Sequence, residues 1–426
     1  MAGRRKSAGA ITVAFALATP LAAQARAPSD TLLARLTAEA LSANPSLAEL
    51  GARERAATAR IKPAGALPDP VLGAGLMNLE LPRFALRRSD FTEVDLEARQ
   101  EFPWPGTLAA RTRAARATAD ERHWNAAVRR REVVIQVATL YHRLRYVVAA
   151  RELLARQYAL LDGAVEIATA RYGTGAVSQS DPLAARVARA RLGSEQAALG
   201  AEDAGLRARL RAARGVSAAE SLSVAPLRGE DVRTLYPTLE AHPHGGVESL
   251  EQHPLLSARR AAAAAAVETA RAEALGARPD FELMARYGAR TIASDFFSTS
   301  VGLRIPLWAG RKQSRLADAA RLEADAERAA LADERARLTA DYDATLAEAA
   351  AGLERLRLLL DDVLPSALAS QEAALRSYRV GQTDFQVVLA AEEALYQAQL
   401  EAADVAAEHL THLVMLEQLT RGEEAP

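Results

Sequence analysis

Residues 92–106, TEVDLEARQEFPWPG, alternate between apolar and charged side chains before a turn that is rich in proline and ends in glycine. Val94, Leu96 and Ala98 fall on one side of an extended chain, and the intervening charged residues fall on the other. A period of two predicts a strand with one apolar and one charged face. About ten residues suffice for a tilted strand to cross a bilayer, and this alternation is typical of a transmembrane barrel. A soluble, half-buried hairpin would show the same alternation, so both interpretations stay open here.

The stretch belongs to an internal repeat. The string FPWPG at residues 102–106 matches IPLWAG at 305–310. Three further matches follow the same order, with offsets of 206 to 211 residues: NP at 44–45 with HP at 253–254, PD at 68–69 with PD at 279–280, and YGTG at 172–175 with YRVG at 378–381. We therefore predict two copies of one unit, at 26–235 and 236–426, joined by a Pro-, Gly- and Ser-rich connector at 216–246.

Alternation predicts two strands in each copy, at residues 71–81 and 92–102 and again at 280–290 and 299–305. The first of these shows the weakest alternation. Four strands are too few to close a barrel, since the smallest known barrels have eight. A barrel would therefore require several chains. Aromatic residues near the strand ends fit either interfacial girdles or a protein core: Phe91, Phe102, Trp104, Phe281, Tyr287, Phe296 and Trp308.

Long helices are predicted between the strands. Neither proline nor glycine occurs from Thr107 until Gly163, so we expect one helix from Thr107 to about Tyr172, roughly 100 Å long. Apolar residues at alternating spacings of three and four predict a coiled-coil seam. The seam comprises Val133, Val137, Leu140, Leu144, Val147, Leu154, Tyr158, Leu161 and Val165, and in the second copy Tyr342, Leu346, Ala349, Leu353, Leu356, Leu360 and Val363. Pro365 predicts a kink or a break in the second long helix.

The composition agrees with long helices and excludes several functions. Hydrophobic residues make up 50% of the 426 residues, aromatic residues only 5%, and much of the apolar part is alanine. The 53 Lys and Arg residues nearly balance the 54 Asp and Glu residues, which argues against a nucleic-acid partner. The chain has no cysteine, which excludes disulfides, thiolate metal sites and cysteine nucleophiles.

The N-terminus is predicted to be a cleaved signal peptide covering residues 1–25. Arg4, Arg5 and Lys6 precede an apolar run that ends in small residues. No cysteine follows the run, so we expect no N-terminal lipid anchor. Beyond residue 26, no apolar stretch approaches the roughly 18 residues of a transmembrane helix. If the mature chain enters a membrane, it must do so as strands.

Known catalytic patterns are absent from the sequence. It contains no phosphate-binding GxxxxGK loop, no GxSxG elbow and no HExxH helix, so we predict no enzyme activity, no catalytic residue and no cofactor. His409 and His412 have a spacing compatible with metal ligation, but no third ligand lies near them in the sequence. We interpret them as a solvated pair and His242 and His244 as loop residues, and we predict no metal site.

Several strings resemble the TolC family of outer-membrane efflux proteins across essentially the whole mature chain. Those most similar to its heavy-metal branch, the Czc- and Cus-like outer-membrane factors, are ALPDP at 66–70, GLMNL at 75–79, FPWPG at 102–106, RYGTG at 171–175 and QSD at 179–181. The resemblance implies a mainly α-helical chain with a transmembrane β-barrel portion. In this family each chain of a homotrimer gives four strands to a 12-stranded β-barrel, which continues as a long coiled-coil α-helical barrel into the periplasm.

The resemblance also implies a function and partners. The protein would sit in the outer membrane of a Gram-negative bacterium, in contact with its lipid. It would passively conduct a substrate, on the heavy-metal interpretation metal cations, from a periplasmic adaptor (membrane fusion protein) and an inner-membrane RND transporter to the exterior. Two alternatives stay open: an outer-membrane channel for drug efflux or type I secretion, and a soluble periplasmic coiled-coil adaptor.

By the same resemblance, two helix-hairpin turns form the periplasmic tip where the adaptor docks. Their residues are Tyr172, Gly175, Ser178, Tyr378, Gly381 and Thr383. Some family members carry an acidic ring just after the second turn. Here Val387 and Ala390 replace the usual later carboxylates, and Asp384 is the only acid before Glu392. Asp384 is therefore interpreted either as a constriction of the tunnel or as a surface helix cap.

Overall fold

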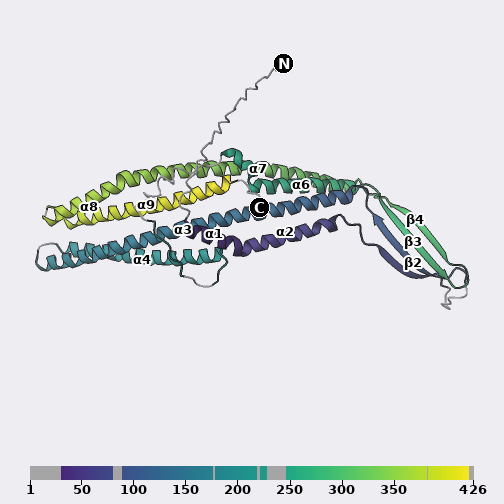
Figure 1. The fold of residues 1–426 in the computed structure, drawn as a ribbon, viewed down its shortest axis with the longest axis horizontal. Coiled ribbons are helices and arrows are strands. Elements are labelled where there is room, and N and C mark those ends of the chain that lie inside the picture. The colour runs from purple at the N-terminus through teal and green to yellow at the C-terminus, as the bar shows by residue number, and fades with distance from the viewer. Residues whose placement is uncertain are drawn as a thin grey trace, which may run out of the picture.

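The computed structural model describes residues 30–79, 89–175, 178–217, 221–227, 246–380 and 382–421. The chain is elongated, with long helices that run side by side and a sheet at one end (Figure 1). The predicted signal peptide, the boundary between the two copies, His242, His244 and Gly381 lie outside the described residues.

The order of a helix, two strands, a long helix and a returning helix occurs twice along the described chain. The first half contains α1 (Thr31–Ala43), α2 (Pro45–Ala64), β1 (Val71–Met77), β2 (Glu93–Phe102), α3 (Thr107–Gly173) and α4 (Ser180–Ala213). The second half contains the 3₁₀ helix η1 (Val247–Gln252), α6 (Pro254–Leu275), β3 (Asp280–Arg290), β4 (Phe296–Arg304), α7 (Gln313–Leu358), the π turn η2 (Leu359–Val363), α8 (Leu364–Arg379) and α9 (Phe385–Thr420).

The matched NP and HP strings cap corresponding helices. Asn44 precedes α2, and its side-chain oxygen accepts a hydrogen bond from the Ser46 N–H at 2.9 Å. His253 precedes α6, and its Nδ1 accepts from the Leu255 N–H at 3.2 Å. In both cases proline takes the first helical position, where its missing N–H is not needed. Two different side chains therefore perform the same capping role.

The four strands form one antiparallel sheet in the order β1-β2-β3-β4. β2 pairs with β3, which joins the two halves of the chain, and Leu96 lies opposite Tyr287 in this pair. All four predicted strands are confirmed in the part of the chain that is described. β4 begins at Phe296, three residues earlier than alternation indicated, and the predicted first strand ends at Met77.

The predicted long helix is confirmed as α3, which has 67 residues and continues through Gly163. Gly106 immediately precedes it, with a φ of 95° in the left-handed region that glycine adopts readily. At about 1.5 Å per residue the helix is roughly 100 Å long. α3 is the central element of the bundle, because α2, α4, α6 and α9 all pack against it.

The predicted seam is buried for most of its length. In α3 the buried members are Val133, Val137, Leu144, Val147, Leu154 and Leu161, and in the second copy they are Tyr342, Ala349, Leu356 and Leu360. The prediction that Val363 belongs to the buried seam is wrong, because this residue is 42% exposed. It ends the π turn η2, and the extra residue of a π turn shifts the following side chains around the helix axis.

Pro365 does not break the second long helix. The π turn η2 stands immediately before it, and the chain then continues as α8. A proline ring clashes with the carbonyl four residues earlier, which here belongs to Asp361 in the π turn. The expected irregularity is therefore one distorted turn.

The interpretation of His409 and His412 as a solvated pair is wrong. The His409 side chain is 2% exposed and His412 is partly buried on the same face of α9. Gly352 of α7 makes room for His409, since a Cβ at that glycine would lie 3.4 Å from His409 Nδ1. His412 Nε2 lies 3.4 Å from Glu348 Oε2. Both histidines therefore belong to the contact between α7 and α9.

Candidate functional site: an exposed sheet and a helical tip

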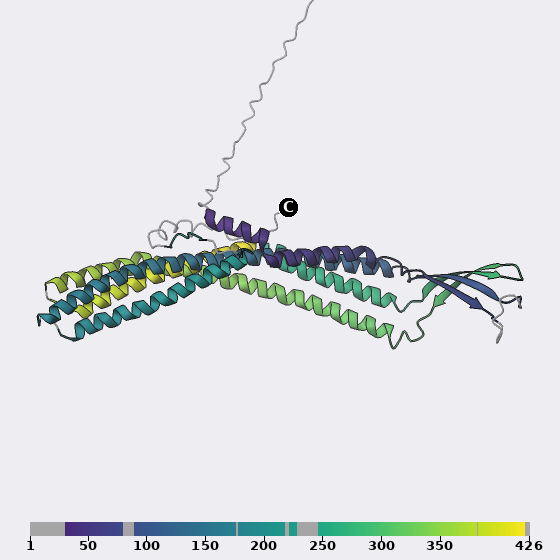
Figure 2. The same ribbon diagram turned by 90° about the horizontal axis from the view of Figure 1, so that it is seen from below.

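The sheet extends beyond the ends of the helices, as Figures 1 and 2 show. One face carries large apolar side chains that remain exposed in the single chain: Leu72, Leu76, Val94, Leu96, Tyr287, Phe297, Val301 and Leu303. Leu72 is 79% exposed and Val301 is 75% exposed. A contiguous apolar patch on this scale marks a surface that contacts another apolar phase or another chain.

The aromatic residues near the strand ends divide between the two interpretations. Trp104 stacks on Phe281 with ring centroids 5.8 Å apart. Phe91 and Trp308, by contrast, are 70% and 71% exposed. Exposed aromatic rings at the ends of apolar strands fit the interfacial girdles of membrane proteins. Among the described helices, none is long and apolar enough to span a bilayer.

The opposite face of the sheet is lined by ion pairs between strands. Arg286 of β3 pairs with Asp95 and, at 2.8 Å, with Glu93 of β2. Arg290 lies 3.4 Å from Glu93, and Arg304 pairs with Glu101 at 2.6 Å. The register puts these charged residues on one face: Arg290 lies directly opposite Glu93, and the longer reach of Arg304 from β4 to Glu101 of β2 passes over β3. A polar face opposite an apolar one suits a strand that lies between lipid and a water-filled lumen.

An aromatic ring completes the charged face near the turn between β3 and β4. Phe296 lies opposite Gly288, which has no side chain to obstruct the ring. The guanidinium groups of Arg286 and Arg290 lie over this ring, 5.7 and 4.6 Å from its centroid. Contacts of this kind are attractive because the ring face is electronegative. They fix the two arginines against the wall of the sheet.

Both helical-hairpin turns lie at the end of the molecule opposite the sheet (Figures 1 and 2). In the turn after α3, Gly175 has a φ of +74° and its N–H donates to the Tyr172 carbonyl at 2.9 Å. The left-handed conformation explains why glycine stands there. Tyr172 and Ser178 are exposed at this turn. The described residues of this turn therefore supply exposed surface.

The turn between α8 and α9 is organised by two aromatic rings. Tyr378 and Phe385 have centroids 5.7 Å apart, and Thr383, in the same turn, is half-buried. Asp384 is the last residue before α9, and its exposed side chain makes no capping hydrogen bond. Asp384 therefore occupies the position before the helix, but its carboxylate does not cap α9.

A contact between an arginine and a tyrosine links the hairpins beside the two turns. The guanidinium of Arg171, in the last turn of α3, lies 5.2 Å from the centroid of Tyr378 in α8. The predicted tip residues that the structure describes are therefore brought to one end of the chain, on two adjacent hairpins. Arg171 was not singled out from the sequence, because its position is an ordinary one in an arginine-rich helix.

Two further links between the hairpins were missed. Arg143 of α3 donates to Glu202 of α4 and to Asp404 of α9, both at 2.7 Å. The Tyr396 hydroxyl of α9 donates to Glu195 of α4 at 2.8 Å. Burial and the neighbouring Glu195 carboxylate raise the pKa of Tyr396, so the hydroxyl keeps its proton. Partners so distant in sequence leave no local signal.

The helices offer no evident metal centre. Within the described residues, no group of three or more His, Asp or Glu side chains is placed to hold a metal ion. The structure therefore presents two features that bear on function: a sheet with opposed apolar and charged faces, and a tip formed by two linked hairpin turns.

Comparisons with known proteins agree with this architecture. Residues 36–216 match the family described as outer membrane efflux protein. No curated protein matches the chain by sequence. Three solved structures of outer-membrane proteins are similar in fold. The outer-membrane channel OprN has a TM-score of 0.78 and 18% identity, over 92% of this chain and 91% of that one.

CusC, whose structures are described in terms of transmembrane channel formation, has a TM-score of 0.79 and 16% identity, over 93% of each chain. The outer membrane protein VceC of Vibrio cholerae has a TM-score of 0.77 and 19% identity, over 92% of this chain and 97% of that one. The chain therefore has the fold of these outer-membrane channels, and residues 36–216 carry the sequence pattern of the outer membrane efflux protein family.

Proposed function

We propose that this protein is the outer-membrane channel of a tripartite efflux system and that it conducts its substrate passively. The observation that carries the proposal is the sheet, whose exposed face is apolar while its other face is lined by cross-strand ion pairs. A soluble periplasmic adaptor would leave apolar side chains such as Val301, which is 75% exposed, in contact with water, which is unfavourable. The match of residues 36–216 to an efflux family points the same way.

The proposed working form is a homotrimer. β1 and β4 are the edges of the sheet, and an exposed edge is a template for pairing with another chain. Three copies would give twelve strands, enough to close a barrel around the charged faces. The long helices would continue the tube on the periplasmic side. We further propose that the chain consists of two copies of one unit, at 26–235 and 236–426, and that each copy supplies two of the four strands.

The tip is proposed to dock the periplasmic adaptor, which connects the channel to an inner-membrane RND transporter. The supporting features are the exposed Tyr172 and Ser178 and the contact of Arg171 with Tyr378, which hold two turns together at one end. Asp384 is exposed there and is available to face the tunnel. The Arg143 and Tyr396 links would hold the two hairpins together.

We propose heavy-metal cations as the cargo, because the strings at 66–79 and 102–106 resemble the Czc- and Cus-like branch. Drug efflux and type I secretion are the alternatives within the same fold, since similarity in fold at 16 to 19% identity does not distinguish between cargoes. Deletion of the gene followed by a metal and drug sensitivity panel separates them. Unchanged tolerance of metals with increased sensitivity to drugs would remove the metal assignment.

Two adjacent residues of β4 provide a sharp test of membrane insertion. Val301 lies on the apolar face and Ser300 on the charged face. Val301→Arg should prevent assembly in the outer membrane, because an arginine facing lipid at mid-depth costs about 2–4 kcal/mol in each chain. Ser300→Arg should insert normally, because its side chain would face water. The measurement is the amount of trimer in the outer-membrane fraction; equal insertion of both variants would contradict the proposal.

A further inference from the structure

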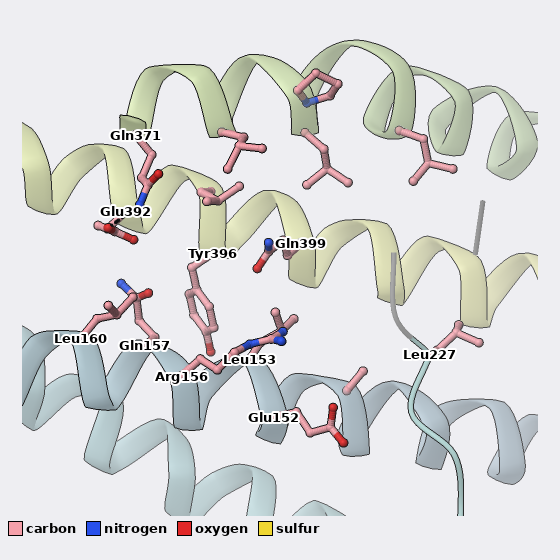
Figure 3. Close-up of a pocket in the computed structure, with 16 residues that line it drawn as sticks. Glu152, Leu153, Arg156, Gln157, Leu160, Leu227, Gln371, Glu392, Tyr396 and Gln399 are labelled. Carbon is pink, nitrogen blue, oxygen red and sulfur yellow. Dashed lines mark hydrogen bonds between the residues drawn. The ribbon is translucent and has the colours of Figure 1, made fainter. Parts of the chain in front are cut away.

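The cavity between α3, α8 and α9 has a volume of about 660 Å³ (Figure 3). Leucines form much of its lining, together with Gln157, Arg156, Glu152 and Glu392. Because the lining carries charges of both signs, it does not distinguish a cation from an anion. The turn between β4 and α7 differs in this respect. Residues 305–312, called the β4–α7 turn below, carry charge of one sign only.

The apolar stripe of β4 continues into the β4–α7 turn. Val301 and Leu303 lie on the apolar face of the sheet, and Ile305 and Leu307 follow at the same period of two. Ile305 is 60% exposed and Leu307 is 81% exposed, and the next residue is the exposed Trp308. The turn lies where the sheet meets the ends of the helices (Figure 2). Exposed apolar surface therefore extends from the sheet to the start of α7.

Hydrogen bonds order the backbone of the turn. The Trp308 carbonyl accepts from the N–H groups of both Arg311 and Lys312, at 2.9 and 3.0 Å. The Ser314 N–H donates to the Ala309 carbonyl at 2.8 Å. The backbone therefore holds the exposed tryptophan one turn away from two basic residues.

The corresponding turn of the first copy is built differently. The Trp104 N–H donates to Asp280 Oδ1 at 2.8 Å, and its ring stacks on Phe281 of β3. Trp104 is partly buried there, whereas Trp308 is exposed. The second turn is also one residue longer, IPLWAG in place of FPWPG. Packing within the chain accounts for Trp104 but leaves Trp308 directed at its surroundings.

Basic residues follow the exposed ring without an acidic neighbour in the sequence. Residues 296–317 include no Asp or Glu. Arg311 and Lys312 are exposed, and neither forms an ion pair within the part of the chain that is described. Arg315, at the start of α7, has a side chain that is 78% exposed and lies 3.9 Å from Asp318. These three side chains therefore present positive charge beside an apolar surface.

We propose that the β4–α7 turn, together with Arg315, binds the head groups of anionic phospholipids. The order along the chain matches the order of depth in a bilayer: apolar strand residues, then Trp308 at the interface, then cations that reach the phosphates. Negatively charged leaflets attract basic segments that lie next to a membrane-spanning element. The inference rests on the proposed function, because that function places β4 in the outer membrane and the turn at its periplasmic leaflet.

Tryptophan fluorescence measures which lipid lies beside the turn. The chain has three tryptophans, so Trp104→Phe and Trp124→Phe leave Trp308 as the single reporter. The full mature chain is reconstituted in vesicles of phosphatidylcholine and phosphatidylglycerol, with bromine on the acyl chains of one lipid or the other. Bromine quenches a ring that it contacts, so the two degrees of quenching give the relative binding constant of the two lipids.

Phosphatidylglycerol should bind beside Trp308 at least about fivefold more strongly than phosphatidylcholine. Arg311→Gln combined with Lys312→Gln should reduce this preference to less than about twofold. Arg321→Gln combined with Arg328→Gln is the matched control. It removes the same charge from positions farther along α7, where each arginine pairs with an aspartate of the same helix, and it should leave the preference unchanged.

A preference below about twofold with the native charges, or one that survives Arg311→Gln with Lys312→Gln, would overturn the lipid proposal. A second reporter, Val301→Trp in a chain with all three native tryptophans replaced by phenylalanine, distinguishes this failure from failure of the proposed function. If neither brominated lipid quenches it, the sheet does not lie in lipid and both proposals fail. If it is quenched while Trp308 shows no preference, only the lipid proposal fails.

Peptidoglycan is the other anionic material that a periplasmic surface meets. Purified peptidoglycan that retains the native chain but not the Arg311→Gln, Lys312→Gln variant, in the absence of any lipid preference, would assign the basic residues to the cell wall and overturn the lipid proposal.

Discussion

Gly215→Ala should destabilise the protein by about 2–4 kcal/mol. Alanine is strained in the left-handed backbone conformation of this position, and its Cβ would overlap a neighbouring segment. Gly215 follows α4 and has a φ of +67°. A Cβ at this position would overlap the carbonyl oxygen of Ala43 and lie 2.9 Å from its carbonyl carbon. Both obstructing atoms belong to the backbone, so no side chain can move aside to relieve the overlap.

The contact matters because it joins the ends of α1 and α4. Asn44 donates from its side-chain amide to the Ala213 carbonyl at 2.7 Å, and the Arg214 side chain, only 4% exposed, pairs with Glu39. A displacement of Gly215 would disturb these buried partners together. Thermal unfolding followed by far-UV circular dichroism measures the effect. A melting temperature equal to that of the wild type would refute the close approach of Gly215 to Ala43.

The same substitution ten residues earlier is the matched control. Gly205 lies inside α4, and a Cβ there would meet nothing within 4 Å. Gly205→Ala should stabilise the protein by about 0.5–1 kcal/mol, because alanine loses less backbone entropy than glycine in a helix. Opposite signs for the two variants would show that the cost at Gly215 comes from its position rather than from any loss of glycine.

Periodicity was sufficient to predict the strands and the helices, because it records which side chains share a face of each element. Val94 and Leu96, at period two, share the exposed apolar face of β2, and Val133 and Val137, at helical spacing, share a buried face of α3. The lengths of the long helices could also be predicted, because long stretches of sequence without proline and with little glycine mark where a helix can continue. The 67 residues of α3 therefore followed from the sequence almost to the residue.

Contacts between elements could not be predicted in the same way. The partners of Arg143 lie 59 and 261 residues away, and Arg143 is one of many arginines in a charged helix. His409 was interpreted as solvated because helical spacing does not show that Gly352 leaves room for it. The cavity beside Gln157 depends on how three helices diverge, which no single helix encodes. Of the candidate tip, the turns were predictable and the contact of Arg171 with Tyr378 was not.

His253→Asn should make the protein more resistant to acid. Burial, with a smaller contribution from Arg131, lowers the pKa of His253 to about 4. In an unfolded chain the pKa of histidine is about 6.5. Above pH 6.5 both states are neutral and stability is unaffected. Below it the unfolded chain takes up a proton that the folded chain refuses, so stability falls by about 1.4 kcal/mol per pH unit until about pH 4.

Asparagine is the substitution of choice because Asn44 already caps the corresponding helix. At pH 7 His253→Asn should unfold close to the wild type, whereas at pH 5 it should be more stable by about 2 kcal/mol. His253→Ala separates the two roles of the residue. Its stability should show the same reduced pH dependence as that of His253→Asn. At every pH, however, its free energy of unfolding should be about 1 kcal/mol lower than that of His253→Asn, because the Leu255 N–H has no capping acceptor.

Urea unfolding at pH 7 and at pH 5 measures all three proteins under identical conditions. Titration of the other groups cancels in the difference between each variant and the wild type, including that of His142, whose pKa is also lowered to about 4, mainly by burial. A wild-type pH dependence in His253→Asn would mean that His253 takes up its proton in the folded state. In that event its Nδ1 could not act as the acceptor that begins α6, and the equivalence with Asn44 would fail.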